Sequence, residues 1–210
     1  MDRKWLIGGV AAFLAVVAVL ALVVGGVVGR SIVPSPTEPA TVATEPTEPT
    51  PEAPKPPRTR RFTDTLTDVS IAFPGSWQRR FSRDQSVRLV ASSPDASAAV
   101  SISVRKSGLE TITRDNLPIV RSLTDDLLRA DQRIGTLPEP VAVTADGLPG
   151  YRYTYNYRAD GGGNGAHVHY FLFKGDRLIQ MVLQAVPAAK LDELRPAFAE
   201  IARTFRGGSG

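Results

Sequence analysis

The fold is decided by residues 151–186, which read YRYTYNYRADGGGNGAHVHYFLFKGDRLIQMVLQAV. Tyrosine occupies every second position from 151 to 157, which is the spacing of side chains on one face of a β-strand. Glycine-containing runs at 160–165 and 174–176 predict two turns. The stretch therefore predicts a meander of three sequential antiparallel strands, over 151–157, 167–173 and 178–186.

Apolar alternation upstream of the meander predicts further strands. Trp77 and Phe81 follow the first of them and are expected in the core. The strands are expected over 69–73, which runs into Pro74-Gly75, over 87–90 and 98–104 as a pair, and over 141–144.

Two helices are predicted from apolar residues at the spacing of one helical face. The first spans residues 116–129, with Thr113 or Asp115 as its cap. The second closes the chain from 191 to 205, and Pro196 predicts a break or a start after its first turn. Strands interrupted by one helix and followed by another predict an α+β domain, an antiparallel sheet covered by helices.

The N-terminal segment predicts a membrane anchor. Residues 5–29 carry no charge and are apolar on every face, and roughly 20 such residues cross the hydrocarbon core as a helix. A cleaved signal peptide, whose apolar region is shorter at about 7–15 residues, is the alternative. Arg3 and Lys4 precede the helix, so residues 1–4 are expected in the cytoplasm and the chain after Arg30 outside the cell.

A proline-rich linker is predicted between the anchor and the folded part. Residues 30–61 repeat Thr-Glu-Pro and hold almost no large apolar side chain, so they cannot offset the entropy of ordering. In the polyproline II conformation, at about 3.1 Å per residue, the linker reaches on the order of 90 Å. Its threonines and prolines are also typical of O-glycosylated stalks. The folded extracytoplasmic domain is accordingly expected over 62–210.

Composition excludes several classes of site. The 210 residues contain no cysteine, which excludes disulfides, thiolate metal sites, a cysteine nucleophile and a cysteine-linked lipid anchor. The net charge is +4, and residues 1–61 hold 7 of the 25 basic and 5 of the 21 acidic residues. The folded part therefore has an ordinary mixed surface, and no nucleic-acid partner is expected.

The order of these elements and three short motifs carry a family resemblance. The motifs are Phe-Pro-Gly-Ser-Trp at 73–77, Gly-Leu-Pro-Gly-Tyr at 147–151 and Phe-x-x-Ile-x-x-x-Phe at 198–205. They resemble the PsbP-like α/β/α sandwich, and within it the LpqN-type surface lipoproteins of actinobacteria. The resemblance implies an extracytoplasmic, non-enzymatic role in binding or assembly and carries over no catalytic residue. Because this chain lacks a lipobox cysteine, the helix at 5–29 is expected to replace the acyl anchor.

The tyrosine row is the candidate for a ligand or partner surface. Four aromatic side chains share one strand face, which is more amphipathic than a core requires. They line either a groove that receives a ligand or partner, or the core beneath a covering helix. The row consists of Tyr151, Tyr153, Tyr155 and Tyr157.

The two histidines are weak candidates for metal ligands. His167 and His169 lie two residues apart on one strand, so their side chains share a face. A site needs a third ligand, for which a carboxylate such as Asp160 would have to serve, and Phe171 and Phe173 continue the same face. No metal or other cofactor is therefore expected.

Catalysis is not expected. No Gly-x-Ser-x-Gly motif is present, and the glycine run at 161–165 lacks the Lys-Ser/Thr ending of a phosphate-binding loop. The sequence favours a single-pass, membrane-anchored binding or assembly domain of the cell envelope, with an envelope protein or ligand as its partner. One alternative is a small-molecule or lipid carrier with a pocket between sheet and helix. A third is a metal-dependent enzyme that uses His167 and His169.

Overall fold

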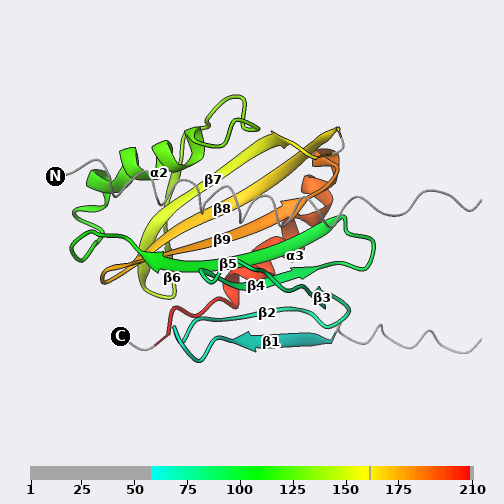
Figure 1. Ribbon diagram of the computed structural model, residues 1–210, viewed down its shortest axis with the longest axis horizontal. Helices are drawn as coiled ribbons and strands as arrows, with labels where there is room; N and C mark the ends of the chain where they lie inside the picture. Colours follow the sequence, from blue (N-terminus) through cyan, green and yellow to red (C-terminus); the bar gives the residue numbers. More distant parts are fainter. Residues whose placement is uncertain (1–57, 161, 209–210) are drawn as a thin grey trace, which may run out of the picture.

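The computed structural model describes residues 58–160 and 162–208. The predicted cytoplasmic residues 1–4, the membrane helix 5–29 and the linker up to residue 57 lie outside these ranges. Within the described ranges, no helix combines the length and the hydropathy needed to cross a membrane. The described residues form a sheet with one helix on each face, the α+β arrangement that the sequence predicts (Figure 1).

The main sheet is antiparallel and has the strand order β3-β4-β5-β9-β8-β7-β6. Strands β7, β8 and β9 form the predicted meander, and β9 then pairs with β5 along its whole length. That last pairing joins the two halves of the chain in the centre of the sheet. The strands are β3 (Gln78–Arg79), β4 (Val87–Ser92), β5 (Ala98–Lys106), β6 (Val141–Ala145), β7 (Leu148–Arg158), β8 (Asn164–Lys174) and β9 (Arg177–Ala185).

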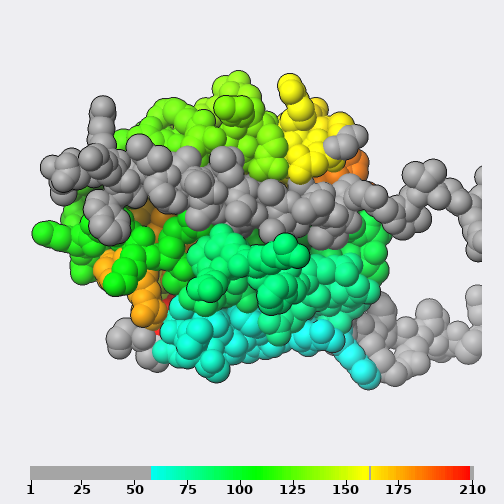
Figure 2. All heavy atoms as spheres, viewed as in Figure 1, coloured from blue at the N-terminus to red at the C-terminus, as the bar shows by residue number. Residues whose placement is uncertain are grey.

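A two-stranded sheet packs beside the main one. It pairs β1 (Thr59–Thr63) with β2 (Ser70–Pro74) and adjoins the β3–β4 segment, as the cyan and blue-green surfaces in Figure 2 show. β1 begins at Thr59, inside the range 30–61 that the sequence predicts as linker. The sequence of β1 lacks apolar alternation, and the strand forms because β2 offers it a complete ladder of hydrogen-bond partners.

The first helix is shorter than predicted. A 3-10 turn spans Leu117–Val120, and α2 (Arg121–Arg129) follows it. Neither Thr113 nor Asp115 caps the helix, because the Asn116 side chain instead accepts a hydrogen bond from the Thr113 backbone N–H at 2.7 Å. The predicted cap is therefore wrong, while the helix itself is confirmed.

The closing helix α3 (Leu191–Arg203) runs unbroken through Pro196 after a 3-10 turn at Ala188–Lys190. The predicted break at Pro196 is wrong. Pro196 lies on the exposed side of the helix, where water can hydrate the carbonyl that loses its N–H partner. The chain then returns along β2, where Ser70 and Arg206 exchange backbone hydrogen bonds of 2.9 and 2.7 Å.

Two cores lie on the two faces of the main sheet. On one face, Phe198 of α3, Phe205 just after it and Phe73 of β2 join a core that includes Trp77, as predicted. On the other face, α2 and its flanking loops pack onto the tyrosines of β7 and the phenylalanines of β8. Phe81, predicted in the core, is 88% exposed. It leaves the sheet because the Arg80 N–H makes the last hydrogen bond to β4, at 2.8 Å from the Val90 carbonyl.

Candidate functional site

The tyrosine row lies under α2. The four side chains share one face of β7, as predicted, and none is more than 7% exposed. Tyr151, Tyr153 and Tyr155 pack with Leu127 and Leu128 of α2 and with Phe171 of β8, and the ring of Tyr157 stacks on His167. The geometry therefore supports the core interpretation for Tyr151, Tyr153 and Tyr155, whereas Tyr157, at the end of the row, also lines a hollow.

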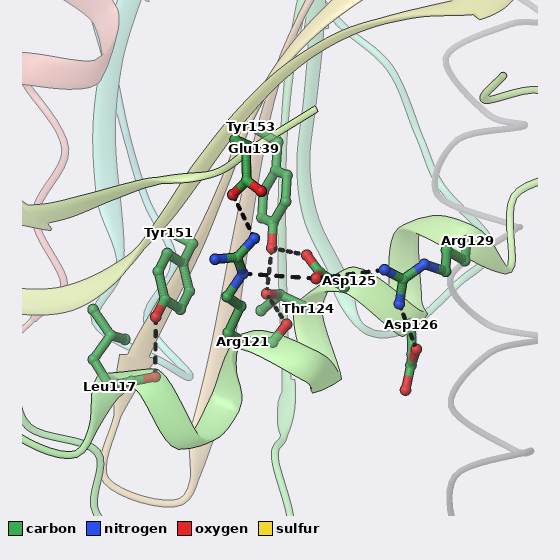
Figure 3. A network of polar contacts seen from close by, with 9 residues as sticks. All are labelled: Leu117, Arg121, Thr124, Asp125, Asp126, Arg129, Glu139, Tyr151 and Tyr153. Atoms are coloured by element: carbon green, nitrogen blue, oxygen red, sulfur yellow. Dashed lines mark hydrogen bonds and ion pairs between the residues drawn. The ribbon is translucent and has the colours of Figure 1, made fainter. Parts of the chain in front are cut away.

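A polar network joins the row to the helix (Figure 3). The Tyr153 hydroxyl donates a hydrogen bond of 2.6 Å to Oδ1 of Asp125, and the Thr124 hydroxyl lies 2.6 Å from the same oxygen of Tyr153. Arg121 and Arg129 approach Oδ2 of Asp125 at 3.8 and 3.6 Å. Burial and the contact with Asp125 raise the pKa of Tyr153 above its ordinary value, so the hydroxyl keeps its proton. The network holds α2 in register on the sheet.

The histidine pair forms a second buried network. His167 and His169 are both 0% exposed, and the Tyr155 hydroxyl lies 3.3 and 3.0 Å from their Nδ1 atoms. His167 also places Nε2 at 3.2 Å from Oε1 of Gln184, and its ring stacks on Tyr157 with centroids 4.1 Å apart. Burial lowers the pKa of His167 to about 4 and that of His169 well below 6.5, so both rings are neutral at physiological pH.

This geometry offers the histidines no third metal ligand. Among the residues that the structure describes, no group of three or more His, Asp or Glu side chains is placed to hold a metal. Asp160, the carboxylate considered from the sequence, is half-exposed and approaches Arg133 at 3.9 Å. Both Nδ1 atoms face the hydroxyl of Tyr155, so the pair serves the packing between β7 and β8.

An open groove runs on the opposite face, between α3 and the outer strands β6, β7 and β8. Two adjoining hollows of about 410 and 200 Å³ form it, and both are lined by Arg152, Tyr170 and Ala199. The groove lies between the sheet and a helix, where the small-molecule or lipid carrier alternative requires a pocket. The apolar part of the lining comes from Val143, Ala145, Val168, Phe198 and Ala202.

Arg152 and Tyr170 form the polar floor of this groove. They are direct neighbours across the β7–β8 ladder, and both side chains are half-buried. Neither makes a hydrogen bond or an ion pair with any residue in the described ranges. The charge of Arg152 and the hydroxyl of Tyr170 therefore line the groove with no partner among the described residues.

The charges at the rim of the groove are neutralised. Arg195 and Arg203 of α3 bind Asp192 and Glu200 of the same helix, at 2.7 and 2.6 Å. Asp146 accepts a hydrogen bond of 2.8 Å from the backbone of Gly207 and lies 3.7 Å from Arg206. Among the described residues that line the groove, Arg152 is thus the charged side chain without an ion pair.

The sequence contains a signal for this groove, although the tyrosine row is the more prominent pattern on the same strand. Arg152, Thr154 and Asn156 alternate with the tyrosine row, so the sequence predicts a polar face on this strand. A polar face on a strand of a helix-covered sheet indicates that the helix leaves part of that face open. Pattern alone could not show where α3 crosses the sheet, and the groove lies beside that crossing.

A further hollow of about 400 Å³ lies at the other end of β7. It is lined by Arg133, Asn156, Tyr157 and Arg158 among others. Arg133 is fully engaged there, because its Nε and Nη2 atoms each donate a hydrogen bond of 2.9 Å to the carboxylate of Asp131. Arg158, by contrast, is exposed at the edge of this hollow, whereas Arg152 is half-buried in the groove.

Comparison with known proteins identifies the fold. No family model and no curated protein sequence matches the chain. The structure is similar to that of cyanobacterial PsbP (CyanoP) from Synechocystis sp. PCC 6803, with a TM-score of 0.55 and 16% identity over 70% of this chain and 91% of CyanoP. The domain therefore has the PsbP-like fold that its motifs predicted.

Two further solved structures show weaker similarity. One is LpqN of Mycobacterium tuberculosis, described as involved in cell envelope biogenesis, with a TM-score of 0.42 and 11% identity over 72% of this chain and 85% of LpqN. The other is the Ran-binding protein Mog1p of Saccharomyces cerevisiae, with a TM-score of 0.48 and 10% identity over 72% of this chain and 96% of Mog1p.

Proposed function

We propose that the chain is a membrane-anchored, non-catalytic binding domain of the cell envelope, and that it recognises an anionic group in the α3 groove. Arg152 is the observation that carries the proposal. Half-buried arginines are ordinarily paired with a carboxylate, because partial removal from water weakens the hydration of the charge. An arginine without a partner in a groove is free to pair with an anion that arrives from outside.

The surroundings of Arg152 define the rest of the ligand. Tyr170 adds a hydroxyl beside the guanidinium, which can donate a second hydrogen bond to the same anion. The apolar side chains of α3 and β6 flank the pair and fit an apolar body next to the anionic group. The expected ligand is thus a carboxylate or phosphate on an apolar carrier, supplied either by a lipid or by a segment of a partner protein.

The envelope location is proposed from the N-terminal sequence. The uncharged run at 5–29 and the basic residues before it support a single membrane helix with the folded domain outside. Protease added to intact cells is expected to remove the domain, while residues before the helix are protected. A domain that protease cannot reach, or one released in soluble form, contradicts this location.

The groove is tested by photo-crosslinking in the native cell. A diazirine amino acid replaces Ala199, which lines both hollows, and in the control it replaces Ala197, which is exposed on the same helix outside the groove. The 199 probe is expected to form a specific adduct that the 197 probe does not. An adduct of lipid mass favours the carrier alternative, and an adduct of polypeptide mass favours partner binding.

The role of Arg152 is tested in the same experiment. Arg152→Met is expected to abolish the adduct at 199. Arg158→Met provides the matched control, because Arg158 lies on the same face of β7 but outside the groove. An adduct that survives Arg152→Met, or that forms equally at 197, argues against the groove as the binding site.

A further inference from the structure

The end of the domain that the linker enters carries a cluster of uncompensated positive charge. We call it the arginine patch; none of its arginines forms an ion pair with a residue in the described ranges. The arginines of α2 and α3, by contrast, are paired with carboxylates. The patch consists of Arg58, Arg60, Arg79, Arg80 and Arg83, all exposed.

The patch is continuous in space although it comes from two segments. Arg58 and Arg60 alternate with Thr59 and Arg61, so they share one side of the β1 segment with Phe62. The guanidinium of Arg79 lies over the ring of Phe62, with its carbon 4.7 Å from the ring centroid. This contact joins β1 to β3, and Arg80 and Arg83 follow in the loop to β4.

The carboxylates beside the patch are occupied by other groups. Asp64 accepts a hydrogen bond from the Thr67 hydroxyl and lies 3.6 Å from Arg88. Asp84 accepts a hydrogen bond of 2.8 Å from the backbone N–H of Ser86 with one of its oxygens. Neither forms an ion pair with a member of the patch. The positive charge of the patch therefore remains available to a partner.

Phe81 lies on the loop that carries Arg80 and Arg83. Its side chain is 88% exposed, and it stands between Arg80 and Arg83 in the sequence. A lone exposed phenylalanine has no packing role within the domain, and its burial against a partner would be favourable. Arginines around a protruding aromatic ring are the composition of segments that lie in a membrane interface.

We propose that the arginine patch and Phe81 dock the domain onto the surface of an anionic phospholipid bilayer. The arginines would contact lipid phosphates, and the Phe81 ring would enter the boundary between headgroups and acyl chains. An acidic protein would also satisfy the arginines. The exposed Phe81 ring on the same loop as Arg80 and Arg83 favours the bilayer, because it needs a hydrocarbon partner close to the anions.

The point at which the linker joins the domain also favours a bilayer as the partner of the arginine patch. The chain enters the domain at Arg58, inside the patch, so a linker that leads back to the membrane presents this end of the domain to it. Tethering also raises the local concentration of the patch at the bilayer, so that a weak surface interaction suffices for docking. This tethering argument rests on the membrane anchor proposed above.

The test measures the distance from the patch to the bilayer in the full chain. Because the chain has no cysteine, Gln85→Cys beside the patch and Gln132→Cys after α2 each provide a single labelling position. The labelled protein is reconstituted into nanodiscs of phosphatidylcholine alone or mixed with phosphatidylglycerol, and a headgroup nitroxide lipid quenches the fluorophore. We expect quenching at 85, and not at 132, only in the anionic discs, and we expect high salt to suppress it.

Two variants distinguish the contribution of the arginines to docking from that of the Phe81 ring. Arg80→Ser with Arg83→Ser is expected to lower the ratio of docked to undocked domain about 30-fold, at roughly fivefold for each arginine. Phe81→Ser is expected to weaken docking while the salt dependence remains. The matched control is Arg158→Ser with Arg177→Ser, which removes two exposed arginines elsewhere and should leave quenching unchanged. All of these residues are exposed, so folding is expected to be retained.

Several outcomes would overturn the proposal. One is equal quenching at 85 and 132, and another is equal quenching at 85 in both kinds of disc. A third is a response at 85 to soluble polyglutamate but not to anionic discs, which would assign the patch to an acidic protein. If the segment 5–29 does not insert, the anchor fails separately, and the same comparison is made by adding the labelled protein to vesicles of the two compositions.

Discussion

The hydroxyl of Tyr153 on β7 donates a 2.6 Å hydrogen bond to the carboxylate of Asp125 on α2 (Figure 3). It connects the sheet to the helix through a buried, charge-assisted contact. Such bonds are stronger than neutral ones, and loss of the donor leaves a poorly solvated carboxylate behind. The attachment of α2 therefore depends on this pair more than on its weakly capped N-terminus.

Tyr153→Phe tests this attachment. It removes one hydroxyl from a side chain that is 0% exposed and is expected to lower the free energy of unfolding by about 2 kcal/mol. Tyr151→Phe is the control, because the Tyr151 hydroxyl lies 3.4 Å from the Leu117 carbonyl in a weaker contact, and should cost well under half as much. Urea unfolding followed by near-ultraviolet circular dichroism measures both. Equal losses would show that the Asp125 contact has no special weight.

Acid is expected to destabilise the domain through its buried histidines. In the unfolded chain a histidine has a pKa near 6.5, whereas burial lowers the pKa of His167 to about 4 in the native state. Between these values the unfolded state binds a proton that the native state does not bind. The contribution to stability is thus complete above about pH 6.5 and is lost as the pH falls towards 4, by about 3 kcal/mol for this group.

His167→Gln isolates that effect from the titration of carboxylates. Glutamine does not titrate, so the variant should lose less stability than the parent protein between pH 6.5 and 4. The comparison uses the difference between the two urea midpoints at each pH. Parallel pH profiles would mean that His167 accepts a proton without cost in the native state.

The sheet and the predicted strands could be read from the sequence because their signals are local. The tyrosine row and the Asp160-to-Asn164 turn region define β7 and β8, and Trp77 was correctly placed in the core. These features depend on alternation and turn chemistry within a few residues. The pairing of β5 with β9 has no such local signal, since it joins segments far apart in the chain.

The errors have a common physical cause. β1 carries arginines where a strand usually shows apolar alternation, and it forms because β2 and the Gly75 N–H supply hydrogen-bond partners, the latter at 2.7 Å from the Arg58 carbonyl. Phe81 is aromatic but follows the point where β3 ends, so no neighbour covers it. In each case tertiary context overrides residue type. The sequence does not single out Arg152 for a related reason, since its availability depends on where α3 lies.

Gly150 is expected to be irreplaceable in β7. A Cβ atom at this position would overlap the carbonyl oxygen of Phe171 and would lie 3.0 Å from the Leu172 Cα, both of which are backbone atoms of β8. Gly150→Ala should therefore force the β7–β8 ladder apart and cost about 3 kcal/mol or more. Gly135→Ala is the control, because no atom lies within 4 Å of the Cβ position there. Similar midpoints for the two variants would contradict the close approach of the strands.

Arg152 and Arg133 are expected to respond in opposite ways to the same substitution. Arg133 makes two hydrogen bonds of 2.9 Å to Asp131, whose side chain is 2% exposed, so Arg133→Met leaves a buried carboxylate without its counter-ion. That change should lower the free energy of unfolding by about 3 kcal/mol. Arg152→Met removes a half-buried charge that stabilises nothing within the described domain, and stability should stay within about 0.5 kcal/mol or rise. Thermal unfolding of the two variants and the parent protein measures the contrast. If Arg152→Met destabilised the domain as strongly as Arg133→Met, Arg152 would be a structural residue, and the retention of an unpaired arginine in the groove would no longer point to a ligand.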